Sequence, residues 1–299
     1  MQGVWKTKMA YGLALMQRER RLRIRRGEPI RECGVDLFPI TMDHYEDFVQ
    51  CKDALTLRLS SLPVRFVGLD YLSAVFALEL DALRKRETDP AASSGGFFFR
   101  LMVLFGLSLR IDMTAKLLSE CVYYRTDGAD GVSIEYIEIT QTGADGNPNT
   151  AKITPFQFSS ILRPLIAAQN QIVLPDESEN AELVDAYEKK KEIEQRGVAL
   201  KTDLDDLVSS VAYHSGVSDA EIMDWNVRDF ENRRRAIERD KNFTLYKQAE
   251  MSGMVTFKNG NPYPSWCFDA ADEKLGTMEY AELAKTLSGA AAPGSGIPG

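Results

Sequence analysis

Histidine is scarce in this chain, which excludes several kinds of catalytic site. His44 and His214 are the only two histidines among 299 residues, and neither lies in an HExxH pattern. The sequence has no GxxxxGK[ST] loop, no GxGxxG between a predicted strand and helix, and no GxSxG elbow around a serine. We therefore predict no catalytic residue, no cofactor-binding residue and no metal site, and we expect a protein that is not an enzyme.

Cysteine is also sparse, and its spacing argues against a disulfide framework. Cys33, Cys51, Cys121 and Cys267 are far apart in the chain, a pattern that favours free thiols in a reducing compartment. Arginines follow the first apolar stretch, the reverse of the order in a secretory signal. We expect a cytoplasmic protein of a bacterial host, or a component of a virion.

Long apolar runs are missing as well. The most apolar segment, residues 97–111, is too short to span a bilayer and contains Arg100 and Arg110. It therefore predicts a buried core helix, and we expect no membrane contact.

The charge is distributed unevenly. Residues 1–31 carry nine Lys or Arg and two Glu, whereas the whole chain has a net charge of −8. This basic arm on an acidic body suits docking on an acidic neighbour, a second copy of the chain included, or binding to nucleic acid. No aromatic residues interleave with the arginines, so nucleic acid is the less favoured partner. The candidate contact residues are Arg18, Arg20, Arg21, Arg23, Arg25 and Arg26.

Local patterns predict an α+β fold that is predominantly helical. Alternation from residue 21 predicts an extended stretch through Leu22 and Ile24, pairing with a second at residues 30–40 as a small N-terminal antiparallel β element. A second short β element is predicted near 132–140, with Ile134 and Tyr136 on one face and Ile137 on the other.

Helical patterns account for most of the remaining chain. Segments with apolar residues at helical spacing include 63–86, 114–124, 155–170 and 204–214. Thr154 is placed at the N-cap and Pro155 at the first position of the helix at 155–170. Ser218 and Glu221 form a capping-box pattern, and Asn226 is placed to cap a long helix that ends near Met251.

The predicted organisation has three parts. Residues 1–170 form an N-terminal α+β region that includes the basic arm 1–31 and a flexible connector at 89–96. Residues 175–285 form a helical C-terminal region, and residues 286–299 form a flexible tail of small residues.

Aromatic side chains supply the other candidate contact residues, because aromatics anchor protein interfaces. They are Phe97 and Phe98 in the apolar helix and Tyr263 and Trp266 near the C-terminal end. Burial in the core is the alternative for the phenylalanines.

Two stretches resemble proteins encoded among the tail genes of bacteriophages of Gram-positive hosts. Residues 27–55, GEPIRECGVDLFPITMDHYEDFVQCKDAL, are similar to the opening of tail-assembly proteins, and residues 245–266, LYKQAEMSGMVTFKNGNPYPSW, are similar to the ending of proteins encoded near the tape-measure gene. The arginine-rich extension before residue 27 departs from that pattern. The resemblance implies a non-enzymatic tail-assembly chaperone whose partners are the tape-measure protein and tail-tube subunits.

Two other functions stay open. The protein could be a structural virion subunit of the tail, neck or baseplate, or a nucleic-acid-binding protein that uses the arginine-rich arm.

Overall fold

The computed structural model describes residues 17–66, 68–88, 96–127, 131–142, 147–176, 203–253, 257, 261–263 and 265–267. The chain divides into two compact units: unit 1 comprises residues 1–177 and 202–238, and unit 2 comprises residues 178–201 and 239–299. The predicted tail 286–299 lies outside the described residues, and so does the predicted connector 89–96 apart from Gly96.

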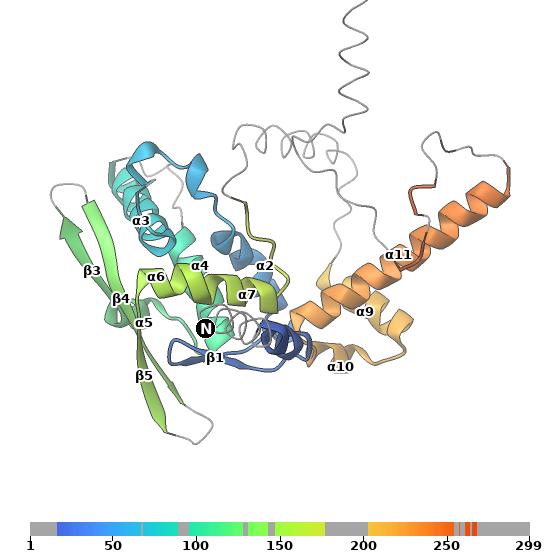
Figure 1. Cartoon of the computed structure of the whole chain (residues 1–299), viewed down its shortest axis with the longest axis horizontal. Coiled ribbons are helices and arrows are strands. Elements are labelled where there is room, and N and C mark those ends of the chain that lie inside the picture. The colour runs from blue at the N-terminus through green and yellow to red at the C-terminus, as the bar shows by residue number, and fades with distance from the viewer. Residues whose placement is uncertain are drawn as a thin grey trace, which may run out of the picture. The chain divides into compact units, whose positions relative to one another are not determined.

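Helices predominate among the described residues, and the strands form two small antiparallel sheets, which confirms the predicted α+β class. Figure 1 shows both sheets and the helices that cover them in unit 1. The helices are η1 (Met42–His44), α2 (Tyr45–Cys51), η2 (Lys52–Leu55), η3 (Leu59–Ser61), η4 (Val64–Phe66), α3 (Tyr71–Thr88), α4 (Phe97–Leu109), α5 (Ala115–Cys121), α6 (Pro155–Gln157), η5 (Phe158–Leu162), α7 (Arg163–Gln169), α9 (Leu204–Ser215), α10 (Asp219–Met223) and α11 (Val227–Met251). The strands are β1 (Ile30–Glu32), β2 (Val35–Leu37), β3 (Val122–Asp127), β4 (Gly131–Thr142) and β5 (Pro148–Ile153).

The arginine-rich segment is helical, so its predicted extended conformation was wrong. Residues 17–25 form a helix in which Ile24 is half-buried against the core. Alternating arginine and apolar residues also suit a helix whose long side chains lie along the surface, because an arginine stem can cover apolar groups while its head stays in water.

The N-terminal β element is instead a hairpin of β1 and β2. Its turn is Cys33-Gly34, where both residues have positive φ, 52° and 84°. A two-residue hairpin turn of type I′ requires a positive φ at both of its central residues. Cys33-Gly34 is therefore the turn that joins β1 to β2.

The three-stranded sheet β3-β4-β5 contains a bulge that changes which side chains of β4 are buried. Tyr123 pairs with Tyr136 and Tyr124 pairs with Ile134, so Glu135 is an extra residue on β4. Strict alternation would put Ile134 and Ile137 on opposite faces, but the extra residue places both in the core. The predicted faces of this strand were therefore wrong beyond Ile134.

Two strands of that sheet were not predicted. Tyr123 and Tyr124, placed in a helix by the sequence pattern, belong to β3, and β5 (Pro148–Ile153) has the composition of a turn. Both are edge strands that pair with β4, so tertiary pairing outweighs weak local preference there.

The predicted core helix is confirmed as α4. Its buried face includes Leu101 and Phe105, and the Phe105 ring meets that of Phe158 edge to face at 5.4 Å. The helix ends in a Schellman-type turn at Arg110, where Ile111 N–H donates to the Gly106 carbonyl. A β-carbon on Gly106 would lie 2.6 Å from the Ile111 carbonyl oxygen, so glycine is needed for the chain to fold back there.

Buried polar side chains attach the β1–β2 hairpin to the rest of unit 1. Gln141 of β4 accepts from the Asp36 backbone N–H and donates to the carbonyls of Asp36 and Leu109, at 2.8–2.9 Å. Asn170, just after α7, accepts from the Ile40 N–H at 2.9 Å. Because these backbone groups are withdrawn from water, the side chains supply the hydrogen bonds that burial requires.

Three predicted helix starts are confirmed. Thr154 with Gln157 and Ser218 with Glu221 form complete capping boxes, and Asn226 accepts from the Asp229 N–H at the start of α11. An isolated antiparallel β-bridge pairs Thr41 with Asn226. It joins the segment before η1 to the start of α11.

Candidate functional site

The arginines of helix 17–25 and of the turn after it, which holds Arg26, fall into two rows with different surroundings. Arg20, Arg23 and Arg26 form the paired row: Arg20 lies 3.7 Å from Glu32, and Arg23 and Arg26 lie 3.4 and 3.6 Å from Glu28. These pairs are largely exposed, so each contributes only a few tenths of a kcal/mol. Their effect is to hold the helix against its own hairpin.

The second row is Arg18, Arg21 and Arg25, named here the arginine row. These residues recur at i, i+3 and i+7, which places them on one face of the helix, and all three are exposed. None of them has an ion-pair partner among the described residues. Burial lowers the pKa of Arg228, and the nearby positive charge of Arg25 lowers it further, while Asp229 opposes both. The arginine row is therefore a basic surface to which the described part of the chain brings no acidic partner.

The phenylalanines of α4 differ in how deeply they are buried. Phe98 is buried, with its ring 4.8 Å from that of Phe76, and Phe97 is half-buried beneath the guanidinium of Arg100 at 4.6 Å. The alternative of core burial therefore describes Phe98. The neighbouring Phe99 is the exposed ring of this cluster.

Tyr263 and Trp266 belong to unit 2, and they differ in exposure. The Tyr263 ring lies 5.0 Å from the ring of Tyr246, so the described residues after α11 lie beside the end of that helix (Figure 1). The Asn261 side chain also reaches Glu250 at 3.4 Å, and Lys247 pairs with Glu250 at 2.9 Å. Trp266 is 63% exposed, Leu245 is 62% exposed and Met251 is 79% exposed. Unit 2 thus presents large apolar groups to solvent.

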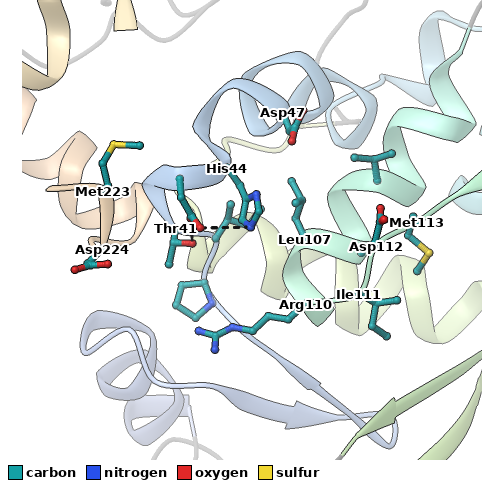
Figure 2. Close-up of a pocket in the computed structure, with 15 residues that line it drawn as sticks. Thr41, His44, Asp47, Leu107, Arg110, Ile111, Asp112, Met113, Met223 and Asp224 are labelled. Carbon is teal, nitrogen blue, oxygen red and sulfur yellow. Dashed lines mark hydrogen bonds and ion pairs between the residues drawn. The ribbon is translucent and has the colours of Figure 1, made fainter. Parts of the chain in front are cut away.

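A cleft of about 650 Å³ lies in unit 1, between η1 and α2, the end of α4 and the end of α10. Figure 2 shows its side chains. Val103, Leu107 and Met223 form an apolar floor, and each is half-buried. The sequence pattern did not indicate this cleft, because its walls come from three segments that are far apart in the chain.

Carboxylates dominate the charges of this acidic cleft. Asp43, Asp47, Asp112 and Asp224 line it and are exposed. Asp43 accepts from the Thr41 hydroxyl and lies 3.6 Å from the Nε2 atom of His44. The other three have no ion-pair partner among the described residues. In Figure 2, Asp47, Asp112 and Asp224 lie on different sides of the cleft.

The cations of the cleft are few and partly engaged. The Arg110 guanidinium lies 4.3 Å above the ring of Phe38, and His44 faces Asp43. The His44 side chain is exposed. Three free carboxylates around an apolar floor suit a ligand that is both basic and partly apolar.

No family model, curated protein or solved structure matches this chain.

Among the described residues, no group of three or more His, Cys, Asp or Glu side chains is placed to hold a metal ion. In the same part of the chain, no helix is both long enough and apolar enough to cross a bilayer. Burial raises the pKa of the Cys51 and Cys121 thiols, so both are mainly protonated near neutral pH.

A second cleft of about 540 Å³, also in unit 1, has a mixed charge. It is lined by Tyr45 and Phe48 from α2 and by Glu231 and Arg234 from α11. The Tyr45 hydroxyl donates to Glu231 at 3.0 Å, and Arg234 pairs with Glu231 at 2.9 Å. Burial, together with the negative charge of Glu231, raises the pKa of Tyr45 to about 12. Because these polar groups pair with one another, the second cleft offers less to a ligand than the acidic cleft does.

Proposed function

We propose that this protein is a non-enzymatic bacteriophage tail-assembly protein that acts through protein–protein contacts as a chaperone for the tape-measure protein. The proposal starts from the resemblance of residues 27–55 and 245–266 to tail-assembly proteins. The observation that carries it is the exposure of Leu245, Met251 and Trp266, which lie in or beside the second of those stretches.

The chemistry of these side chains suits capture of an apolar polypeptide. Tryptophan and other large apolar groups contribute most to binding when a partner removes them from water. In unit 2 the surrounding polar residues include Lys247 and Glu250, which pair with each other and keep the surface hydrated. An assembly protein needs this combination because it must bind an extended partner without aggregating.

Co-purification with the tape-measure protein tests the proposal. The wild-type chain should co-purify with a tagged tape-measure protein from co-expressing cells. A triple variant Leu245→Ser, Met251→Ser, Trp266→Ala should lose about 2 kcal/mol or more of binding free energy, about 30-fold in Kd.

The matched control replaces exposed apolar side chains of unit 1. Val64, Val173 and Tyr213 are 84–88% exposed, and their triple change to serine removes similar apolar area from a surface outside the resembling stretches. The control should bind as the wild type does. Failure of the wild-type chain to co-purify at any salt concentration, or an equal loss in both triple variants, contradicts the proposal.

Mass spectrometry of purified phage particles separates a chaperone from a structural virion subunit. A chaperone is absent from the finished particle, whereas a tail, neck or baseplate subunit is present in a fixed copy number.

A further inference from the structure

We propose that the acidic cleft of one copy of this chain binds the arginine row of a second copy. The inference concerns unit 1 and is independent of the apolar surface of unit 2, on which the proposed function depends. It rests on the match between two surfaces of opposite charge: the arginine row, and three carboxylates of the cleft that have no ion-pair partner among the described residues.

The arginine row has an apolar residue at its centre. Leu22 follows Arg18 by four residues and precedes Arg25 by three, so it lies on the same helical face, and it is 40% exposed. Arg18 and Arg25 are seven residues apart, about 10 Å along a helix. The surface is thus a short stripe of three guanidinium groups around one leucine.

The acidic cleft has the complementary layout. Its three carboxylates without ion-pair partners among the described residues, Asp47, Asp112 and Asp224, stand on different sides of the cleft (Figure 2). The floor residues Leu107 and Met223 are half-buried side chains that a leucine can cover. Guanidinium–carboxylate pairs supply orientation, and burial of Leu22 on the floor supplies area.

The arginine row of the same chain does not occupy the cleft. Helix 17–25 is held to its own hairpin by the paired row, and no ion pair joins Arg18, Arg21 or Arg25 to a cleft carboxylate among the described residues. As far as the described residues go, both the row and the cleft are therefore open to another molecule.

The two surfaces adjoin each other, which favours a reciprocal exchange. Gly27, just after the helix, lies against Asn226 and Pro39: a β-carbon on it would be 2.7 Å from the Asn226 Nδ2 atom and 4.0 Å from the Pro39 ring. Pro39 also lines the acidic cleft. Two copies related by a twofold axis can each insert a row into the other's cleft, which gives a closed dimer.

Sedimentation velocity with charge-reversed variants tests this dimer, over about 1–100 µM protein, where an interface of modest size dissociates measurably. The row variant is Arg18→Glu, Arg21→Glu, Arg25→Glu, and the cleft variant is Asp47→Lys, Asp112→Lys, Asp224→Lys. Each variant alone should dimerise at least about tenfold more weakly than the wild type, because every docked pair becomes repulsive. Raising the salt from about 50 to about 500 mM should weaken the wild-type dimer.

The decisive measurement is the equimolar mixture of the two variants. Each then meets a partner with the opposite charge at both contacts, so a heterodimer should form with a Kd within about threefold of the wild-type value. A variant that merely misfolds cannot be rescued in this way, and thermal unfolding of each variant checks its folding separately.

A matched control reverses three exposed cations elsewhere, Arg84→Glu, Lys116→Glu, Lys241→Glu, and should dimerise as the wild type does. Wild-type protein that stays monomeric across the range overturns the proposal, as does a mixture that stays monomeric. A third outcome also overturns the dimer proposal: the wild type is monomeric and binds duplex DNA in a salt-dependent way, and the row variant does not bind it. The arginine row would then contact phosphates. Loss of dimerisation in the row variant with unchanged tape-measure binding supports the dimer and leaves the proposed function standing.

Discussion

The described residues of unit 1 and of unit 2 differ in how much of their apolar surface is buried. Every buried hydrophobic residue among the described residues belongs to unit 1, and the last along the chain is Phe230. The described residues of unit 2 include none that is buried, and they expose Leu245, Met251 and Trp266. The described residues of unit 1 therefore combine an apolar core with clefts at the surface. The described residues of unit 2 leave their large apolar groups in water, where a partner can cover them.

The largest expected effect compares one aromatic residue from each unit. Phe158→Ala in unit 1 should lower the free energy of unfolding by about 3–5 kcal/mol, because Phe158 is fully buried against Phe105 and its removal leaves a cavity. Trp266→Ala in unit 2 should change it by less than about 0.5 kcal/mol. Urea denaturation followed by circular dichroism measures both, and similar losses in the two variants would erase the distinction between the units.

A smaller loss is expected when the polar connection within the unit 1 core is removed. Gln141→Leu keeps the size of the side chain but leaves the N–H and carbonyl of Asp36 and the carbonyl of Leu109 without their hydrogen bonds. We expect a loss of about 2–4 kcal/mol by the same denaturation assay. Thr140→Val, on the exposed face of the same strand, is the control and should cost much less; equal costs contradict the role given to Gln141.

Hydrogen exchange along α11 sharpens the comparison without any substitution. Backbone amides near Phe230 lie in the part of the helix that contributes to the core, whereas those near Met251 have no buried side chain beside them. Amides around residue 230 should exchange at least about tenfold more slowly than those around residue 248. Uniform protection along the helix indicates that unit 2 has a stabilising contact outside the described residues.

The smallest expected effect is a fall in the free energy of unfolding at alkaline pH, caused by Tyr45 of unit 1. The pKa of Tyr45 is raised from 10.0 to about 12 by burial and by Glu231, so between these values the folded state holds the proton more tightly than the unfolded state. This contribution is fully present below about pH 10 and is lost as the pH rises through about 12. Tyr45→Phe should flatten the fall in unfolding free energy over that window. An unchanged slope shows that Tyr45 titrates as it does in the unfolded chain.

The sequence predicted correctly the helices that carry a strong local pattern, either an apolar run or an N-terminal cap. The apolar run at 97–111 gave α4, and the capping patterns at Thr154, Ser218 and Asn226 gave three helix starts. These signals work because a cap or an apolar face acts within one or two turns of its own helix.

Errors arose where distant pairing sets the conformation. β5 has little apolar alternation and is a strand because it pairs with β4. In β4, the extra residue Glu135 places Ile134 and Ile137 on the same, buried face. At helix 17–25, the period of the arginines alone did not distinguish a charged strand from a helix that is held by its own ion pairs.

The candidate contact residues follow the same division. The sequence identified the arginines and Trp266 by residue type, but it did not separate the arginine row from the paired row or tell which of Phe97 and Phe98 is buried in the core. The acidic cleft was missed because Asp47, Asp112 and Asp224 are far apart in the chain and carry no shared pattern.

Residue order by itself determined the helical character of the chain, the scarcity of histidine and the separation of a basic arm from an acidic body, because these depend on composition and on neighbours a few residues away. Tertiary structure alone decided which arginines lack acidic partners among the described residues and which aspartates line the same cleft as apolar side chains. The physical reason is that burial and charge pairing depend on distances in space, which are fixed only when segments far apart in sequence pack together.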